Sequence, residues 1–537
     1  MSDDATPLAQ LLDTLATPER DAVISHIEQV TRERDEYKKL AALLQEANEK
    51  LKRGLVGQSA ERLPSNDAQL SLAILRLALG LKDDDSETKP PPDEEQRIPE
   101  HTRRKPVRKP FSESFPRVTI DLIPEEVKRE GLDAFERMGE EAREVLERRP
   151  ASTVVVRLVY PKFVRKDRAK DAPTSVLIAE PPELPISRGT AGPAMLADTL
   201  VRRWADHQPL NRLEGIYARD GLDLAKSTLS TWHDQLRELA EPLVDAMFTD
   251  AKSAPYLCVD ATGVLVQAPE RCKHGHFWVM VAPEKHVLYK FSQRHDSAAV
   301  DALLAGYAGY LVADAHAVYD HLYAMGAVVE VGCWAHGRRY FFKALESDPE
   351  RAKAALVKIG ALFKIERAHA DAPRKQREIT RRLKSKPIVD DFFEWCEAES
   401  ELVLDGSPMA KAIGYALNQE LALRRFLDDG RLPLHNNISE LALRREVVGR
   451  RNWMFVGSED GAKANTVFVS LIASCRMLGL EPYAYLRDLL CLLPSWPKHR
   501  LLELAPAYWN DTLEQSDAQQ RLDANVFRRV SLGLPVP

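Results

Sequence analysis

From Pro255 onward the chain alternates between short apolar runs and helical runs, and this alternation constrains the fold more than any other feature. The apolar and β-branched composition of three segments predicts strands at 256–266, 276–282 and 285–291, the last two joined through Pro283-Glu284. The pattern then predicts a helix, a strand, a helix, a strand and a helix at 296–305, 310–313, 315–325, 327–332 and 334–345. We therefore expect an α/β domain built on one sheet.

A long helical stretch interrupts this domain before its closing helices. Residues 346–430 have a helical pattern throughout, and 364–386 carry nine Lys or Arg against three Asp or Glu. Helices are expected again at 437–448 and within 462–493. The interruption therefore has the composition of a basic, all-helical insertion.

The N-terminal part contains a heptad pattern over residues 20–55. Val23, Val30, Tyr37, Leu44 and Leu51 recur every seven residues, and Asn48 is a polar member of the interleaved series. This spacing favours a coiled coil, in which a buried Asn fixes register and strand number. The alternative is an amphipathic helix packed on its own chain.

A charged linker is expected over residues 83–110. Asp83–Glu95 holds seven acids, one Lys and three consecutive prolines, and Arg97–Lys109 holds six basic residues and one Glu. Such blocks cannot bury a core. Arg103, Arg104 and Lys105 could lie along a DNA backbone or minor groove. The alternative is a solvated linker.

Between the linker and the sheet we expect two further regions. Residues 116–180 indicate a small α+β domain, with a strand at 153–160. Residues 189–247 are helical, and 221–232, which include Lys226, resemble a turn leading into the second helix of a helix-turn-helix. A plain helical hairpin is the alternative.

Composition excludes several classes of protein. At roughly 150 residues per domain, 537 residues suggest three or four domains. The chain is 44% apolar with a formal net charge of −6, which excludes a disordered or fibrous protein. No uninterrupted apolar stretch predicts a membrane span, and the acidic start, Met1-Ser-Asp-Asp, has no signal-peptide pattern, so we expect a cytoplasmic protein with no membrane partner.

Three carboxylates stand out by position. Asp260 lies within the first expected strand, Asp314 ends the fourth, and Glu440 lies on the first turn of the helix after the insertion. If the first and fourth strands are neighbours, Asp260 and Asp314 project toward one edge of the sheet. Clustered carboxylates repel one another unless cations neutralise them. Oxygen ligands select Mg²⁺ or Mn²⁺, and two such ions can promote phosphodiester cleavage.

Each carboxylate also has a structural alternative. Asp260 could be a buried charge with a protein partner. Asp314 could be the N-cap of the helix that follows it. Glu440 could form a capping box with Asn437, because Asn-x-x-Glu has the required spacing.

Several segments resemble one known family. Residues 332–342 (Gly-Cys-Trp-Ala-His-Gly-Arg-Arg-Tyr-Phe-Phe), 436–444 (Asn-Asn-Ile-Ser-Glu-Leu-Ala-Leu-Arg) and 449–458 (Gly-Arg-Arg-Asn-Trp-Met-Phe-Val-Gly-Ser) are the most specific. Residues 480–486, 504–509 and 204–212 also fit. In this order they resemble the transposases of the insertion sequence 66 family, a bacterial DDE group on the RNase H fold.

The resemblance implies a fold and a catalytic triad. The expected fold is multidomain α+β, with an RNase H-like α/β catalytic domain, a large helical insertion, an N-terminal coiled-coil helix and a mostly helical DNA-binding region. Asp260, Asp314 and Glu440 would be the catalytic residues and the ligands of two Mg²⁺ ions, with Mn²⁺ as a substitute.

The resemblance also implies partners. We expect double-stranded DNA, both the terminal inverted repeats of the element and the target, a homodimer or higher oligomer, and small accessory proteins of the same element. Candidate DNA contacts are Arg338, Arg339, Arg444, Arg450 and Arg451, in addition to Lys226 and the basic linker. A solvated helix face is the alternative for the arginines near Glu440.

Zinc is not expected. Family members usually carry Cys pairs in their N-terminal half, and here the first cysteine is Cys258. Cys333 and His336 form a Cys-x-x-His unit, but its spacing from Cys272 and His276 is not that of a zinc site. We expect Cys333, His336 and Asn437 to support the structure.

The expected boundaries place a dimerisation region first and a tail last. They are 1–82 coiled-coil region, 83–115 linker, 116–180 α+β domain without zinc, 181–250 DNA-binding region, 251–345 and 431–500 catalytic domain, 346–430 insertion and 501–537 tail. The predicted function is a DNA transposase that cuts element ends and joins the 3′-hydroxyl to target DNA. The alternatives are a nuclease of the same fold without strand transfer, and a non-catalytic DNA-binding relic or regulator.

Overall fold

The computed structural model describes residues 111–536 apart from 112, 114, 150–151, 167–175 and 269–270. The expected coiled coil at 20–55 and the charged linker with Arg103, Arg104 and Lys105 lie outside the described residues. The described chain divides into two units. One is the helical unit, Trp334–Gly430, and the other, the sheet unit, holds the remaining described residues.

A five-stranded sheet forms the centre of the sheet unit. Its strands are β4 Tyr256–Val266, β5 Lys273–Ala282, β6 His286–Ser292, β7 Gly309–Val312 and β8 Val328–Val331. The strand order is β6-β5-β4-β7-β8. β5 is antiparallel to β4 and β6, whereas β7 runs parallel to both β4 and β8. All five strands occur where the alternating sequence pattern predicts them.

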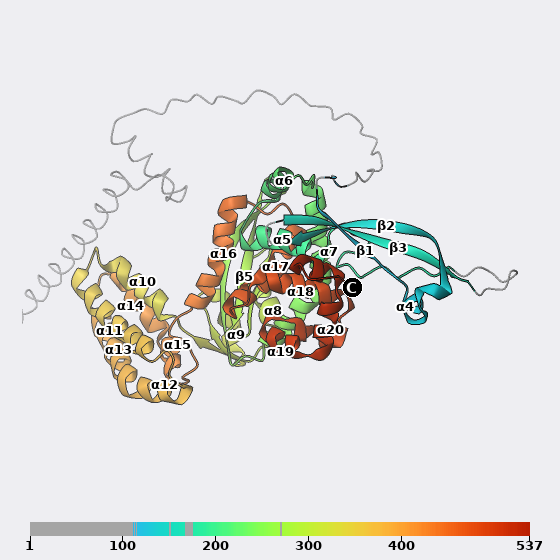
Figure 1. The fold of residues 1–537 in the computed structure, drawn as a ribbon. Helices are drawn as coiled ribbons and strands as arrows, with labels where there is room; N and C mark the ends of the chain where they lie inside the picture. The colour runs from blue at the N-terminus through green and yellow to red at the C-terminus, as the bar shows by residue number, and fades with distance from the viewer. Residues whose placement is uncertain are drawn as a thin grey trace, which may run out of the picture. The chain divides into compact units, whose positions relative to one another are not determined.

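Helices connect and cover this sheet. The connecting helices are α8 Ser297–Leu304, the 3₁₀ turn η4 Ala317–Tyr319 and α9 Asp320–Ala324. α16 Asn437–Trp453 packs against β4 and β5, whereas α17 Glu459–Met477 packs against β6 and α7 Lys226–Ala251 (Figure 1). α16 is five residues longer than the sequence predicts, and it leads directly toward the far end of β4.

β6 is an edge strand, and two serines of α17 occupy its free hydrogen-bonding positions. The hydroxyl of Ser474 accepts from the Val287 N–H at 2.9 Å, and that of Ser470 accepts from the Tyr289 N–H at 2.8 Å. Alternate residues of a strand and residues four apart on a helix have similar spacing, so one helix face matches the edge.

A second sheet precedes the first. It consists of β1 Arg117–Asp121, β2 Phe135–Arg149 and β3 Ser152–Arg165 in the order β1-β3-β2, with α4 Glu125–Glu130 and the turn η2 Leu132–Ala134 between β1 and β2. β1 pairs with β3 in parallel and β2 pairs with β3 antiparallel. The strand expected at 153–160 is confirmed and is longer than predicted.

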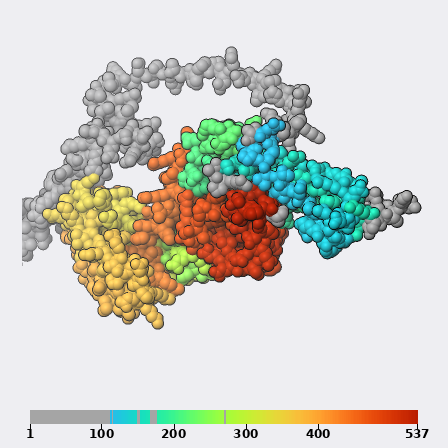
Figure 2. Space-filling model, in the orientation of Figure 1, coloured from blue at the N-terminus to red at the C-terminus, as the bar shows by residue number. Residues whose placement is uncertain are grey.

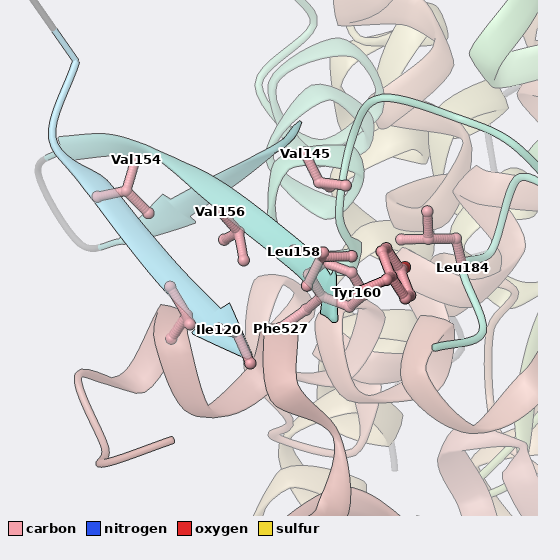
Figure 3. Packing of buried hydrophobic residues seen from close by; sticks show 9 residues of the cluster. Ile120, Val145, Val154, Val156, Leu158, Tyr160, Leu184 and Phe527 are labelled. Atoms are coloured by element: carbon pink, nitrogen blue, oxygen red, sulfur yellow. The ribbon is translucent and has the colours of Figure 1, made fainter. Parts of the chain in front are cut away.

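The C-terminal residues complete the core of this second sheet. Residues 501–537 contain the short helices α19 Trp509–Glu514, α20 Ser516–Ala524 and α21 Val526–Leu532, so this segment is not a tail. Phe527 and Val530 of α21 are fully buried against Val156 and Leu158 of β3 (Figure 3). The C-terminal helices and the strands accordingly form one continuous surface in Figure 2.

The remaining helices of the sheet unit lie between these parts. They are α5 Pro193–Leu200, the π-helix η3 Val201–Ala205, α6 Leu210–Arg219, α18 Pro482–Leu492 and the 3₁₀ turns η7 Leu493–Ser495, η8 Lys498–Leu504 and η9 Pro506–Tyr508. α18 packs against α5. Among the helices that the structure describes, none combines the length and apolar character needed to cross a bilayer.

The helical unit is all-helical, as its sequence pattern predicts. It contains α10 Trp334–Ala344, α11 Pro349–Ala368, α12 Arg374–Thr380, the π-helix η5 Arg381–Ser385, α13 Lys386–Ser400, α14 Pro408–Asn418, α15 Glu420–Arg424 and the turn η6 Arg425–Leu427. The aromatic side chains of Trp334, Phe392 and Phe426 pack together in its core.

The basic run of the helical unit divides between internal pairs and solvent. Arg381 is fully buried and donates to Glu366 and to the carbonyls of Phe426 and Asp429. Seven basic side chains of the run are exposed, and two of them, Arg374 and Lys386, pair with Glu378 and Asp390. Part of this charge therefore stabilises the unit itself, and part is available to an anionic partner.

Candidate active site

Asp260 lies within β4, and Asp314 lies two residues after the end of β7, the parallel neighbour of β4. The two strands are parallel, with Cys258 opposite Val312, and each aspartate lies two residues further along. Paired strands are about 4.8 Å apart, so the two backbones are adjacent at this level. Both side chains are half-buried, and the Asp260 carboxylate accepts from the Ala261 N–H at 2.8 Å.

A buried tyrosine lies near both carboxylates. Tyr319 lies in η4 and is 1% exposed. Burial raises the pKa of the Tyr319 hydroxyl well above its usual value, and the negative charges of Asp314 and Asp260 raise it further. Burial, Glu330 and Asp314 likewise raise the pKa of Tyr323. The negative charges of Asp314, Asp260 and Glu330 therefore act on these two tyrosine hydroxyls.

A cluster of histidine and aromatic rings lies near Asp314. His295 stacks on Trp278 with ring centroids 4.7 Å apart, and it meets His316 and His276 at 4.7 and 5.1 Å. Burial and the neighbouring His316 lower the pKa of His295, whereas Asp314 opposes this shift. The sequence analysis missed His295, His316 and Tyr319. The only sequence signal was the position of His316, two residues after Asp314.

Asp314 does not act as a helix cap. The N-cap of η4 is His316, whose ring accepts from the Val318 N–H at 3.3 Å. The alternative structural role for Asp314 is therefore wrong.

Glu440 reaches the same region from α16. It is half-buried near the start of the helix, and α16 is attached to the sheet on both sides of it. The Tyr289 hydroxyl of β6 donates to the Ala442 carbonyl at 2.8 Å.

Asn436, rather than Asn437, fixes the start of α16. Asn436 is the N-cap and is fully buried, and its side-chain amide donates to the Val259 carbonyl of β4 at 2.9 Å. Its backbone N–H donates to the Cys333 sulfur at 3.2 Å. Asn437 is the first helical residue and is exposed, so the alternative of a capping box between Asn437 and Glu440 is wrong. The residue bound to Asn436 directly precedes Asp260.

The carboxylates offer oxygen ligands of the kind that Mg²⁺ and Mn²⁺ prefer. Within the described residues, no three His, Cys, Asp or Glu side chains converge closely enough to hold a metal ion. Asp260 and Asp314 thus follow the last paired residues of two neighbouring strands, and no three-ligand group that includes them and Glu440 is found among the described residues. The chemistry of these carboxylate donors fits a divalent cation.

The predicted DNA-contacting arginines near Glu440 differ in their surroundings. Arg444 and Arg451 are exposed on α16. Arg450 donates to the Thr262 hydroxyl at 3.1 Å and to the Gly263 carbonyl, both on β4. Arg450 therefore anchors α16 to the strand of Asp260, which the sequence did not reveal.

The other predicted contacts lie on three different elements. Arg338 and Arg339 are exposed on α10 of the helical unit, and His336 is on the same helix. Lys226 is exposed at the first position of α7. Three residues of α7 that follow it, Leu229, Trp232 and His233, are buried in the sheet unit. The first turns of α7 thus present one exposed and one buried face.

Comparisons with known proteins match most of the chain. Residues 188–464 match the model described as Transposase IS66 family, and 470–507 match the IS66 C-terminal element. Residues 43–120 match Transposase C of IS166 homeodomain, which lies N-terminal to the α6–α7 pair expected to read DNA.

Two relatives come from Sinorhizobium fredii (strain NBRC 101917 / NGR234). The uncharacterized protein y4hP is 31% identical over 489 residues, covering 86% of this chain and 87% of the relative. The uncharacterized protein y4qI is 29% identical over 471 residues, covering 84% and 85%. Since the family model spans more than half of the chain and includes the strands and helix that carry Asp260, Asp314 and Glu440, the chain belongs to the IS66 family of transposases.

Proposed function

We propose that this protein cuts DNA at the ends of its insertion sequence and joins the freed 3′-hydroxyl to target DNA, with Asp260, Asp314 and Glu440 as the ligands of two Mg²⁺ ions. The observation that carries the proposal is that Asp260 and Asp314 each lie two residues beyond Cys258 and Val312, the last paired residues of two neighbouring parallel strands. Glu440 comes from a helix whose first turn is bonded to the residue before Asp260.

The sheet supports an RNase H-like catalytic domain. Its strand order is third, second, first, fourth and fifth, with only the second strand reversed. This arrangement brings the first and fourth strands together, and these are the strands from which the family's two aspartates would come.

The chain's own residues position the reacting groups. Asp260 and Asp314 would hold the cations beside β4 and β7, and Glu440 would complete the ligand set from α16. Arg444 and Arg451 would bind phosphates beside the site. When bound, the two ions would activate the attacking water or 3′-hydroxyl and stabilise the leaving oxygen. Mn²⁺ would substitute for Mg²⁺.

The partners in this proposal are two DNA ends, a target duplex and a second copy of the chain. Two ends must be held at once, and the heptads at 20–55 would supply a dimer. Small accessory proteins of the same element and a cytoplasmic, DNA-associated location belong to the same proposal. Sedimentation of the full chain with and without end DNA tests the oligomer.

The test of the chemistry is a cleavage and joining assay on a duplex that carries the element's terminal inverted repeat. Asp260→Asn and Asp314→Asn should each abolish Mg²⁺-dependent cleavage and leave end binding near normal, because the amide loses the charge that holds a cation. Asp301→Asn is the matched control, since this exposed carboxylate on α8 bonds only His321 among the described contacts. Cleavage at the wild-type rate in either active-site variant contradicts the assignment.

Glu440→Gln tests the third ligand separately. We expect this variant to fold and bind end DNA but to lose both cleavage and joining. If the wild-type protein cleaves the duplex but does not join the ends, the result would favour a nuclease. If the wild-type protein binds the duplex without cleaving it, the result would favour a non-catalytic regulator.

A further inference from the structure

α16 ends in a strained turn that displays two apolar side chains. Met454 has φ +59° and ψ −46°, and the Phe455 N–H donates to the Trp453 carbonyl at 2.7 Å. A three-residue turn in which the third N–H bonds the first carbonyl, and in which the middle residue has a positive φ, is a γ-turn of the rare and strained kind. Strain at a non-glycine residue persists only where the surrounding structure enforces it.

Both sides of this turn are fixed to the sheet. Val456 follows the turn, is buried, and pairs with β4 through the Leu265 carbonyl and the Gln267 N–H, each at 2.8 Å. Trp453 precedes the turn and packs with Val456 against Val264 and Phe277. Because the flanking residues are held inward, the two between them are forced outward. Met454 is 72% exposed and Phe455 is 38% exposed.

The surface that leads to the turn is basic. Arg444, Arg451 and Asn452 are exposed on α16, and so are the apolar side chains of Leu441 and Val448 on the same helix. α16 is coloured orange in Figure 2. Two exposed acids, Glu459 and Asp460, begin α17 after the turn, so an anionic partner would approach from the α16 side. Exposed apolar side chains next to arginines suit duplex DNA, because the arginines can bind its phosphates and the apolar side chains can contact its stacked bases.

Two independent paths give the distance from the carboxylates to the turn. β4 rises about 3.3 Å per residue, so the six residues from Asp260 to Val266 span about 20 Å. α16 rises about 1.5 Å per residue, so the path from Glu440 to Met454 spans about 21 Å. Base pairs in duplex DNA are about 3.4 Å apart, so either path corresponds to about six base-pair steps.

We infer that Met454 and Phe455 form a wedge that enters the base stack of double-stranded DNA about six base pairs from the phosphate held at Asp260 and Asp314. This inference rests on the proposed function. Apolar side chains that enter a base step unstack it and kink the duplex. The wedge would bend the DNA end over α16 and direct its terminal phosphate toward the carboxylates.

The experiment uses the full chain and a duplex that carries the element's terminal inverted repeat, with 2-aminopurine placed in turn at each base pair near the cleaved phosphate. Divalent cations are omitted so that the duplex stays intact. Binding should raise the fluorescence of the probe at about the sixth base pair. Met454→Ala/Phe455→Ala should lose this rise and bind about tenfold more weakly, since contact between a base and an apolar or aromatic side chain contributes on this scale.

Three further variants keep the test independent of folding. Met325→Ala removes a methionine that is 75% exposed elsewhere in the sheet unit, and it should behave as wild type. Met454→Gly relieves the positive φ, so it should fold at least as well and still lose the fluorescence rise. Arg451→Ala should weaken binding and lower its salt dependence, while the rise persists at saturating protein.

The possible results distinguish a failure of the wedge from a failure of the proposed cleavage and joining activity. Cleavage and joining by wild type without local unstacking would overturn the wedge alone. A fluorescence rise that persists in the double Ala variant, or the absence of DNA binding, would also overturn it. A rise that depends on Met454 and Phe455 in a protein that does not cut would support the wedge and contradict the proposed activity.

Discussion

Asn436 connects three parts of the candidate active site through one small side chain and its backbone. Its amide donates to the carbonyl that precedes Asp260, its N–H donates to the Cys333 sulfur, and its carbonyl accepts from the Glu440 N–H at the start of α16. A buried carbonyl without a partner costs about 1–3 kcal/mol, so this position is energetically constrained. We regard Asn436 as a positioning residue, because it acts on the site through Asp260 and α16.

Asn436→Ala should lower the stability of the sheet unit by about 1–3 kcal/mol and reduce cleavage more strongly than DNA binding. The physical reason is that α16 loses its attachment to β4 at the turn that carries Glu440. Measuring the cleavage rate and the binding affinity on the same duplex shows whether cleavage falls more than DNA binding. Asn437→Ala is the matched control, since its side chain is exposed one residue away, and equal losses in the two variants would contradict the role given to Asn436.

Several residues of the site could be predicted from sequence and others could not. Asp260 and Asp314 follow apolar runs, and the sequence pattern is enough to place Asp260 within the first strand and Asp314 at the end of the fourth. The cap at Asn436 was misplaced by one residue because both Asn436 and Asn437 are favourable cap types, and only tertiary contacts select between them. His295 and Tyr319 approach Asp314 through the fold, so no local pattern marks them.

At the scale of elements, the contact between α17 and β6 resolves the problem of an open sheet edge. Unpaired N–H groups on an edge strand invite pairing with another chain. Ser470 and Ser474 satisfy two of these groups from a helix. The hydroxyls replace a sixth strand.

Ser470→Ala/Ser474→Ala should lower stability by a few kcal/mol, because two buried N–H groups lose their acceptors. The exposed edge should also promote self-association at elevated temperature. Thermal unfolding with light scattering measures both effects. Ser400→Ala serves as the control, since this helical hydroxyl bonds only to the Glu397 carbonyl of its own helix among the described contacts, and a similar shift there would contradict the argument.

Strand β2 is an element that its sequence does not predict. Residues 135–149 are rich in Glu and Arg, which favour helices, and they lack β-branched side chains except Val145. The strand forms because β3 is strongly β-branched and pairs with it along almost its whole length. Pairing with a partner overrode local propensity, as it often does in sheets. The strands of the central sheet were predictable because each carries its own apolar pattern.

At the scale of the whole molecule, one buried acid links distant segments. Glu147 of β2 is fully buried and accepts from the N–H groups of Arg148 and Met195, at 2.8 and 2.9 Å. Burial raises the pKa of Glu147 to about 8, against 4.5 for a free Glu. The folded protein therefore holds a proton here that the unfolded chain releases. The stability contributed by this proton is present below pH 4.5 and is lost as pH rises toward about 8.

Glu147→Gln should remove this part of the pH dependence, because the amide mimics the protonated acid at every pH. Wild type should lose stability between mildly acidic and mildly alkaline solution by a few kcal/mol, and the variant should lose less. Chemical denaturation at both pH values measures the difference. Glu141→Gln, an exposed carboxylate paired with Lys162 on the same sheet, should retain the wild-type slope. A wild-type slope in Glu147→Gln would mean that Glu147 is ionised when folded.

The contact between Cys333 and Asn436 has a consequence for how the chain is assembled as a set of modules. The chain leaves the sheet unit after Cys333 and returns at Arg431, a few residues before Asn436. The residues where the chain leaves and re-enters the sheet unit are thus close in space. The whole helical unit is therefore an insertion at one point of the sheet unit. Closing a loop of any length between fixed, nearby ends costs little more free energy as the loop grows. Recombination could therefore exchange the helical unit for another of different size, or a short glycine linker could replace it, without altering the pairing of β4 with β7.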